Sequence, residues 1–285
     1  MSTAVDRAGE EDALGAFVRD HPRLLVLTGA GCSTASGIPG YRDRDGQWKG
    51  RAPAQYADFV GSAHARRRYW SRSLLGWQRV SSAEPNATHH ALAALERAGV
   101  VRTLVTQNVD GLHQRAGSRR VVDLHGRLDE VECLECGGRV ARADVQAQLL
   151  AWNPSYREAL AAGLAAPARP DGDADWEADL SGFVVPECAA CGGVLKPSVV
   201  FFGENVPRGR VDAVQEALAA ADALLVVGSS LMVFSGYRFC LAAADAGKPV
   251  AAVNQGTTRA DALLALKIEE DCGSVLSRLA EALAR

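Results

Sequence analysis

Four of the seven cysteines in this chain stand in two pairs with the spacing of metal ligands. Cys133 and Cys136 form the first pair, Cys188 and Cys191 form the second, and Gly-Gly follows each pair. Two thiolates at this spacing can occupy two corners of a tetrahedron around a zinc ion. Four protein ligands leave no position for a reacting water, so the pairs predict one structural Zn²⁺. Reduced, buried cysteines are the alternative.

A histidine at a predicted strand end could move a proton. His125 follows the apolar run 121–124 and precedes Gly126. Imidazole takes up a proton near neutral pH, which suits a general base. A histidine whose hydrogen bonds are satisfied inside the core is the alternative, and position alone does not separate the two. Cys32 could act as a nucleophile, but no local signature supports that role.

A glycine-rich turn follows the first predicted strand and could hold phosphate. In Gly29-Ala30-Gly31 the first glycine permits a tight turn, and the second lets backbone N–H groups approach a pyrophosphate. The usual dinucleotide fingerprint has a third glycine where this chain has Thr34, and an acidic residue about 20 positions later, which we do not find. The turn therefore departs from that of a hydride-transferring dehydrogenase. A glycine turn that only starts a helix is the alternative.

A sheet is needed to bring these candidates together. Short apolar runs predict strands buried on both faces at 23–27, 101–105, 121–124, 223–227 and 250–253. Helical patterns follow at 88–98, capped by Asn86, and at 208–221 and 271–284. This alternation indicates an α/β fold with a Rossmann-like parallel sheet. Polar and small residues follow five strands, and we expect them to share the crevice at the carboxyl ends. Ordinary polar loops are the alternative.

Two stretches do not fit the alternation. Residues 133–191 show no sustained periodicity and include an acidic segment at 171–179, and residues 43–85 contain one helical run, at 62–77. We expect both stretches to leave the sheet and to form a smaller helical, zinc-binding domain. The predicted division is a larger Rossmann-like domain of residues 1–42, 86–130 and 195–285 and a smaller domain of residues 43–85 and 131–194.

Composition and charge exclude several classes of function. With 285 residues, of which 48% are hydrophobic and 23% charged, the chain can bury a full core. The net charge of −3 provides no basic field, so we expect no nucleic-acid partner. No uncharged stretch is long enough to cross a membrane, and the acidic first 20 residues lack the apolar segment of a signal peptide. We expect a cytoplasmic protein without membrane contact, and a monomer.

Six motifs, in order along the chain, resemble the sirtuin family. The match runs from about residue 23 to 282 and includes the two cysteine pairs. The other motifs are 29–42 (GAGCSTASGIPGYR), 107–113 (QNVDGLH), 124–126 (LHG), 196–204 (KPSVVFFGE) and 228–231 (GSSL). Residues 67–70 (RRYW) and 233–239 (VFSGYRF) resemble the class II branch, especially its mitochondrial lineage.

The resemblance implies an NAD-dependent protein lysine deacylase. In this family the acyl-lysine carbonyl oxygen displaces nicotinamide from the ribose of NAD, and the products include free lysine and 2′-O-acyl-ADP-ribose. NAD is then a co-substrate that is cleaved, which agrees with the missing ribose-binding acid. The implied partners are acylated protein lysines.

The resemblance also assigns roles by motif position. It makes His125 the base for a ribose hydroxyl, with Asn108 and Asp110 as the other catalytic residues, in the nicotinamide pocket. The residues that it assigns to NAD are Gly29, Ala30, Gly31, Ser36, Ile38, Tyr41, Arg42, Gln107, Asn108, Asp110, Gly228, Ser229, Ser230, Asn254, Gln255, Gly256 and Cys272. Those that it assigns to the acyl-lysine peptide, which would add as a strand, are Val200, Phe202, Gly203, Glu204 and Val233.

Tyr69 and Arg72 are a further candidate for substrate contact. They share a helix face at i and i+3, and in some class II sirtuins a Tyr/Arg pair at this spacing binds the carboxylate of a succinyl or malonyl group. An arginine fork matches a carboxylate in two places. A solvated helix face, crowded by the arginines at 66–68, is the alternative. A preference for acidic acyl groups is therefore a hypothesis.

Some residues depart from the family pattern. Gly40 stands where the family usually has Asp, and Ser235 replaces a common Pro in the substrate loop. Two other functions compete with deacylation: a mono-ADP-ribosyltransferase that uses the same NAD pocket, and a non-catalytic NAD or ADP-ribose sensor. His125 argues against the sensor, because a protein that only binds has no need of a base.

Overall fold

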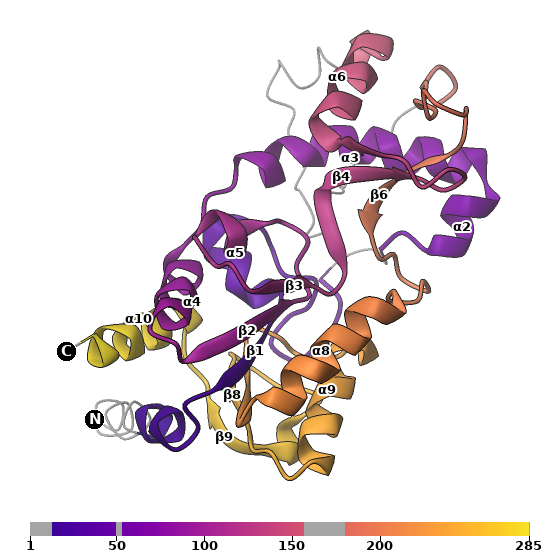
Figure 1. Cartoon of the computed structure of the whole chain (residues 1–285). Helices are drawn as coiled ribbons and strands as arrows, with labels where there is room; N and C mark the ends of the chain where they lie inside the picture. Colours follow the sequence, from indigo (N-terminus) through magenta and orange to yellow (C-terminus); the bar gives the residue numbers. More distant parts are fainter. Residues whose placement is uncertain (1–12, 50–52, 157–179, 285) are drawn as a thin grey trace.

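The computed structural model describes residues 13–49, 53–156 and 180–284. Its larger sheet has six strands in the order β3-β2-β1-β7-β8-β9, and all neighbouring strands run parallel (Figure 1). The predicted Rossmann-like sheet is confirmed. β9 is an additional strand that the sequence analysis does not predict, and most of its residues are only half-buried. The bounds are β1 Leu24–Thr28, β2 Val101–Thr106, β3 Val121–Asp123, β7 Ala223–Val227, β8 Val250–Val253 and β9 Leu264–Ile268.

Helices cover both faces of this sheet. Leu24 and Val26 of β1 belong to a core shared with α4, α10 and the helix at residues 13–20. Leu25 and Leu27 point to the opposite face, where the core is shared with α8 and α9. A strand buried on both faces requires an unbroken apolar run, which is why the predicted strands were readable. The three predicted helices are confirmed to within one residue at each end, as α4 Ala87–Arg97, α8 Arg208–Ala220 and α10 Cys272–Leu283; α9 is Phe234–Asp245.

A second, antiparallel sheet carries the cysteine pairs. Its strands lie in the order β5-β4-β6, and α2, α3 and α6 share its core in the upper part of Figure 1. β5 and α6 fall within residues 133–191, where the sequence shows no sustained periodicity. α3 also runs beyond the predicted 62–77. The bounds are β4 Gly126–Cys133, β5 Arg139–Ala141, β6 Leu195–Val199, α2 Tyr56–Gly61, α3 Ala63–Ser82 and α6 Arg142–Trp152.

The predicted domain boundaries do not agree with the positions of β4 and β6 in the second sheet. β4 is one continuous strand from Gly126 to Cys133, and β6 pairs with it antiparallel from Leu195 to Val199. Residues 126–130 and 195–199 therefore lie in the second sheet, whereas the predicted division assigns them to the larger domain. The acidic segment at 171–179 lies outside the described residues.

Three short elements complete the described chain: η1 Ala30–Ser36, α5 Leu112–Arg115 and η2 Asp261–Leu263. Across residues 13–49, 53–156 and 180–284, no helix combines the length and the apolar character needed to cross a membrane.

Two buried histidines lie side by side on α4 and α5. The rings of His89 and His113 are 4.8 Å apart. His89 Nδ1 accepts a hydrogen bond of 3.2 Å from the Asn86 backbone N–H, which completes the cap of α4, and His113 Nε2 lies 3.0 Å from Thr28 Oγ1. Burial disfavours the imidazolium and lowers the pKa of His89 to about 4 and that of His113 to about 3. Both rings are therefore neutral in the folded protein at pH 7.

We expect the protein to lose stability as the pH falls from about 7 to about 5. The unfolded chain takes up protons below the ordinary histidine pKa of 6.5, whereas folded His113 does so only near its pKa of about 3, so acid favours unfolding. For His113 alone, the free energy of unfolding should fall by on the order of 2 kcal/mol. Urea denaturation at the two pH values measures this loss. His113→Gln should reduce it and His64→Gln, on the exposed face of α3, should not; equal losses in all three proteins would contradict the role of His113.

Candidate functional site

A cavity of about 650 Å³ opens at the carboxyl ends of the six-stranded sheet. Its wall includes residues that follow β1, β2, β3, β7 and β8, as the parallel topology requires. The predicted site residues that line it are Gly29, Ala30, Gly31, Ile38, Tyr41, Arg42, Gln107, Asn108, Asp110, His125, Val200, Phe202, Gly203, Glu204, Gly228, Ser229, Ser230, Val233, Asn254, Gln255 and Cys272.

Four of the residues predicted for NAD or the substrate, all in the described part of the chain, do not line this cavity. Ser36 Oγ accepts a hydrogen bond of 2.9 Å from Asn86 Nδ2 and thereby ties η1 to the cap of α4. The Gly256 carbonyl accepts one of 3.2 Å from the side chain of Asn254, so Gly256 supports a residue that does line the cavity. The other two are Tyr69 and Arg72.

The Tyr69 ring is packed inside the core of the second sheet. It lies 5.4, 5.5 and 5.1 Å from the rings of Phe59, Trp70 and Phe201, and the residue is 4% exposed. Arg72 lies one turn further along α3 and is half-buried. The pair is not brought to the cavity, because α3 directs Tyr69 into this aromatic core.

His125 lies at the cavity, in the short connection between β3 and β4. Gly126 has a φ of +85°, and a Cβ at this position would lie 2.0 Å from the Ser198 carbonyl oxygen, so the chain requires glycine here. His125 Nδ1 lies 3.0 Å from the Gln107 carbonyl oxygen, which can only accept, so Nδ1 carries the ring proton. Burial lowers the pKa of His125 to about 4. At neutral pH Nε2 is therefore unprotonated and can accept a proton.

Asn108 and Asp110 are joined through Ser33, a residue that the sequence analysis misses. Ser33 Oγ accepts a hydrogen bond of 3.0 Å from Asn108 Nδ2 and donates one of 2.7 Å to Asp110 Oδ2. Asn108 Nδ2 also donates to the Gly29 carbonyl at 3.0 Å, and the Leu112 backbone N–H donates to Asp110 Oδ1 at 2.9 Å. Burial raises the pKa of Asp110. This network fixes an amide and a carboxyl group next to each other on the cavity wall.

The glycine turn packs closely against the end of β7. The Gly31 N–H donates a hydrogen bond of 2.8 Å to the Gly228 carbonyl. It is therefore engaged within the protein, which differs from the predicted role of approaching a pyrophosphate, although the turn does line the cavity. Cys32, the next residue, is buried, and burial raises the pKa of its thiol well above the usual value. A reactive thiolate is thus disfavoured at Cys32.

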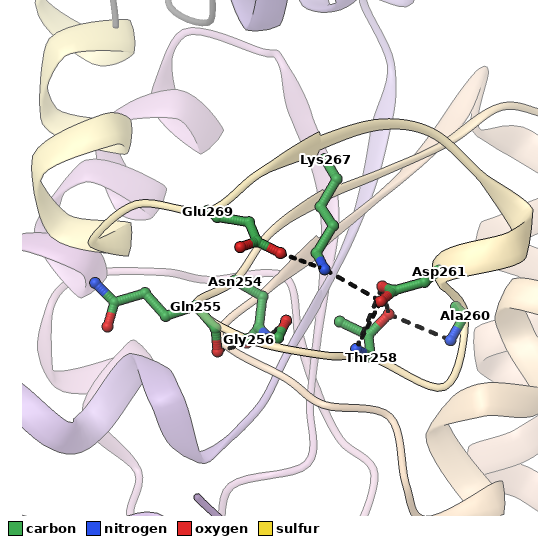
Figure 2. Close-up of polar contacts among 8 residues, drawn as sticks. All are labelled: Asn254, Gln255, Gly256, Thr258, Ala260, Asp261, Lys267 and Glu269. Carbon is green, nitrogen blue, oxygen red and sulfur yellow. Dashed lines mark hydrogen bonds and ion pairs between the residues drawn. The ribbon is translucent and has the colours of Figure 1, made fainter. Parts of the chain in front are cut away.

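The loop after β8 supplies another part of the wall, and Figure 2 shows the polar contacts of this loop. Asn254 Nδ2 donates to the carbonyl oxygens of Gln255 and Gly256, both at 3.2 Å. The next residue, Thr257, donates its backbone N–H to the Arg44 carbonyl at 3.0 Å. The loop therefore has a fixed shape, and it is joined to the segment that contains Arg44.

Three aromatic rings pack together at the wall. The rings of Tyr41, Trp48 and Phe202 have centroid separations of 5.7 to 6.1 Å and edge-on geometry. The Arg42 guanidinium lies 3.9 Å from the centre of the Trp48 ring, within range of a cation–π contact. Trp48 is not among the predicted site residues. The cluster joins predicted NAD residues to a predicted acyl-lysine residue.

Lys196 fixes the chain segment that leads to the predicted substrate residues. Its side chain is 1% exposed, and Nζ lies 3.1 Å from Glu204 Oε2 and 3.6 Å from Glu132 Oε1. Nζ also donates to the Val199 carbonyl at 2.6 Å. Glu204 Oε2 accepts a hydrogen bond of 2.8 Å from the Phe201 backbone N–H. A buried lysine of β6 thus positions the turn that follows this strand.

We expect Lys196→Met to destabilise the protein far more than Lys267→Met. Lys196→Met removes the cation that pairs with the Glu204 carboxylate, which is 21% exposed, and the Nζ donor to the Val199 carbonyl, and together these losses cost about 3 kcal/mol. Lys267 also has two carboxylate partners, Asp261 at 3.1 Å and Glu269 at 2.6 Å, but its side chain is 23% exposed (Figure 2). Surface pairs of this kind contribute about 1 kcal/mol or less. Urea denaturation of the two variants measures the difference in the free energy of unfolding. Equal losses of stability would contradict the larger contribution expected of the buried Lys196.

The four paired cysteines converge at the end of β4. Their sulfur atoms all lie within 4.8 Å of one another. The Sγ atoms of Cys133 and Cys191 are 3.5 Å apart, and those of Cys136 and Cys188 are 3.8 Å apart. Tetrahedral zinc with Zn–S bonds of about 2.3 Å places its sulfur ligands about 3.8 Å apart. The cluster therefore fits one structural zinc ion, with all four positions filled by thiolates.

Comparison with known proteins identifies the family. Residues 29–235 match the model of the Sir2 family. An NAD-dependent protein deacetylase of Bordetella bronchiseptica is 57% identical over 274 residues, which cover 96% of this chain and 98% of that protein. An NAD-dependent protein deacetylase of Xanthomonas campestris pv. campestris (strain 8004) is 56% identical over 280 residues, which cover 98% of this chain and 93% of that protein.

Solved structures share the fold over nearly the whole chain. One described as "Structural Basis for the Mechanism and Regulation of Sir2 Enzymes" has a TM-score of 0.74 and 33% identity, covering 97% of this chain and 98% of that one. Another, described as "Sir2-p53 peptide-NAD+", has a TM-score of 0.73 and 28% identity, covering 95% and 97%. The family model and these relatives together show that this chain belongs to the Sir2 family.

Proposed function

We propose that this protein removes acyl groups from protein lysine side chains with NAD as co-substrate, giving nicotinamide and 2′-O-acyl-ADP-ribose. The observation that carries the proposal is the convergence of His125, Asn108 and Asp110 on one cavity in a chain of the Sir2 family. The relatives from Bordetella and Xanthomonas bear the name NAD-dependent protein deacetylase. A related Sir2 structure contains a p53 peptide together with NAD+.

Each residue proposed to contact NAD would have a role that follows from its chemistry. When bound, NAD supplies a ribose carbon that can be attacked and nicotinamide as the leaving group. The Asp110 carboxylate would accept a hydrogen bond from the nicotinamide NH₂ group, with Asn108 held beside it by Ser33. His125 Nε2 would take the proton of a ribose hydroxyl. The turn at 29–31, with Gly228–Ser230, would border the phosphates, and Asn254 the adenosine ribose.

The acyl-lysine would enter along the apolar part of the wall. Val200, Phe202 and Val233 line the cavity and offer no charge to an acyl chain. The peptide backbone would add as a strand beside Gly203 and Glu204. Since neither Tyr69 nor Arg72 lines the cavity, we propose an uncharged acyl group such as acetyl as the preferred substrate.

Three further assignments belong to this proposal. The class II branch is supported by the motifs at 67–70 and 233–239. The smaller domain would comprise residues 43–85 and 126–199, because the second sheet includes β4 and β6. Cys133, Cys136, Cys188 and Cys191 would hold its zinc.

We also propose a monomeric, cytoplasmic enzyme that acts on acylated proteins and not on nucleic acid, which agrees with the net charge of −3.

The experiment combines the protein with NAD and three lysine peptides: one unmodified, one acetylated and one succinylated. We expect nicotinamide release that requires the acyl peptide, with soluble acyl-ADP-ribose detected by mass spectrometry. Labelled NAD separates the competing function, because stable ADP-ribose on a protein would indicate a mono-ADP-ribosyltransferase. Faster turnover of succinyl-lysine than of acetyl-lysine would contradict the proposed acyl preference.

A further inference from the structure

Ser235 touches the base that the proposed function requires. It lies in the first turn of α9, it is half-buried, and it lines the cavity. Ser235 Oγ is 2.8 Å from His125 Nε2. The two residues are 110 positions apart in the chain, so only the fold brings them together.

The direction of this hydrogen bond follows from the other side of the ring. His125 Nδ1 faces the Gln107 carbonyl oxygen at 3.0 Å, and because that oxygen can only accept, the proton of the neutral ring is on Nδ1. Nε2 then has a lone pair and no proton. The Ser235 hydroxyl therefore donates to Nε2.

We propose that Ser235 is a gating and positioning residue, whose hydroxyl occupies the lone pair of His125 Nε2 until a hydroxyl of NAD displaces it. The inference rests on the proposed function, in which Nε2 takes a proton from that substrate hydroxyl. A lone pair that accepts from Ser235 is not available to a second donor. Substrate binding therefore replaces one hydroxyl by another at the same atom, and the ring keeps its orientation throughout.

The backbone around Ser235 confines the change to its side chain. The next residue, Gly236, is packed so closely against the Gln107 side chain that a Cβ would lie 2.6 Å from Gln107 Oε1. The start of α9 is thus fixed against the loop that also supplies the carbonyl partner of His125. Ser235 can leave Nε2 by rotation about its Cα–Cβ bond, without a shift of the helix.

Displacement of Ser235 by NAD predicts a change in NAD affinity and a change in the titration of His125 when the hydroxyl is removed. NAD must compete with the Ser235 hydroxyl, so Ser235→Ala should bind NAD about 3- to 10-fold more tightly, the worth of one such hydrogen bond. A hydrogen bond donated to neutral imidazole favours the neutral form, so its removal should shift the titration of His125 to higher pH. Ser235→Thr keeps the hydroxyl and should resemble the wild-type protein in both respects.

The test measures NAD affinity by calorimetry and the titration of His125 by ¹⁵N NMR of the histidine rings, in the full-length protein without peptide. Ser82→Ala is the matched control, because it removes an exposed serine hydroxyl at the end of α3. Tighter NAD binding and a His125 titration at higher pH in Ser235→Ala, but not in Ser235→Thr or Ser82→Ala, would support the gate. Unchanged or weaker binding, or an unchanged titration, would overturn it.

Neither readout requires turnover, so the inference can fail separately from the proposed function. A wild-type protein that binds NAD but releases no nicotinamide with any acyl peptide would refute the deacylase, whereas the two measurements would still decide the gate. A loss of kcat in Ser235→Ala at unchanged NAD affinity would show that the hydroxyl relays the proton, which contradicts displacement.

Discussion

Replacing His125 by alanine should reduce acyl-peptide-dependent nicotinamide release by about 10³-fold, within the range of about 10² to 10⁴ typical of a general base. The reason is the state of the ring in the folded protein. With the proton on Nδ1 and the pKa lowered to about 4, His125 presents an unprotonated Nε2 to the cavity at pH 7. Alanine has no group that can accept a proton at this point.

The His125→Ala variant should remain folded, because the side chain is not part of the hydrophobic clusters that hold the two sheets. It should still bind NAD, because the other cavity residues assigned to NAD are unchanged. Calorimetric NAD affinity and the midpoint of urea unfolding check both points. His64→Ala, which alters an exposed histidine outside the cavity, is the control and should retain full turnover. Turnover near the wild-type rate in His125→Ala would mean that another group is the base.

The larger sheet could be predicted from the sequence because each of its central strands is marked locally. β1, β7 and β8 are buried along their whole length and therefore read as unbroken apolar runs. The second sheet has no such mark. β4 has exposed and half-buried positions, and β5 is exposed throughout. β6 pairs with β4 but lies far from it along the chain. Pairing between distant, mixed strands is decided by tertiary packing and not by local pattern.

The candidate site was predictable where the family resemblance assigns a role to the residue, and not where a hydrogen bond between distant segments gives the residue its role. His125, Asn108 and Asp110 belong to motifs, and all three line the cavity. Ser33 and Ser235 were not among the predicted site residues, because their roles depend on single hydrogen bonds between segments 75 or more positions apart. Tyr69 shows the opposite limit, since helical spacing predicts which residues share a face and not what that face packs against.

Cys188→Ala should abolish zinc binding and disrupt the second sheet. Structural zinc sites contribute on the order of 10–16 kcal/mol of apparent binding energy, which is comparable with the stability of a whole domain. Cys188 supplies one of four sulfur atoms that lie within 4.8 Å of one another. Three ligands would leave the tetrahedron open, so we expect zinc content to fall from about one ion per chain to a small fraction of that value.

The effect of Cys188→Ala should extend to the cavity. The cysteine cluster connects the end of β4 to the segment that leads into β6. At its other end β4 begins directly after His125, and β6 leads at its other end toward Glu204, the ion-pair partner of Lys196. We therefore expect lower acyl-peptide turnover together with a lower urea midpoint. Zinc content by atomic absorption, turnover and urea unfolding, measured on one preparation, test this linkage.

Cys240→Ala is the control that separates loss of the metal from loss of a buried cysteine. Cys240 is fully buried in the core between the six-stranded sheet and α9, and its sulfur is not part of the cluster. Its truncation removes packing alone, at a cost of about 1 kcal/mol, and should leave one zinc ion bound and the cavity active. If Cys188→Ala instead retained zinc and turnover as Cys240→Ala does, the four thiols would not be acting as a single metal site, and the stability of the second sheet would have to come from its hydrophobic core alone.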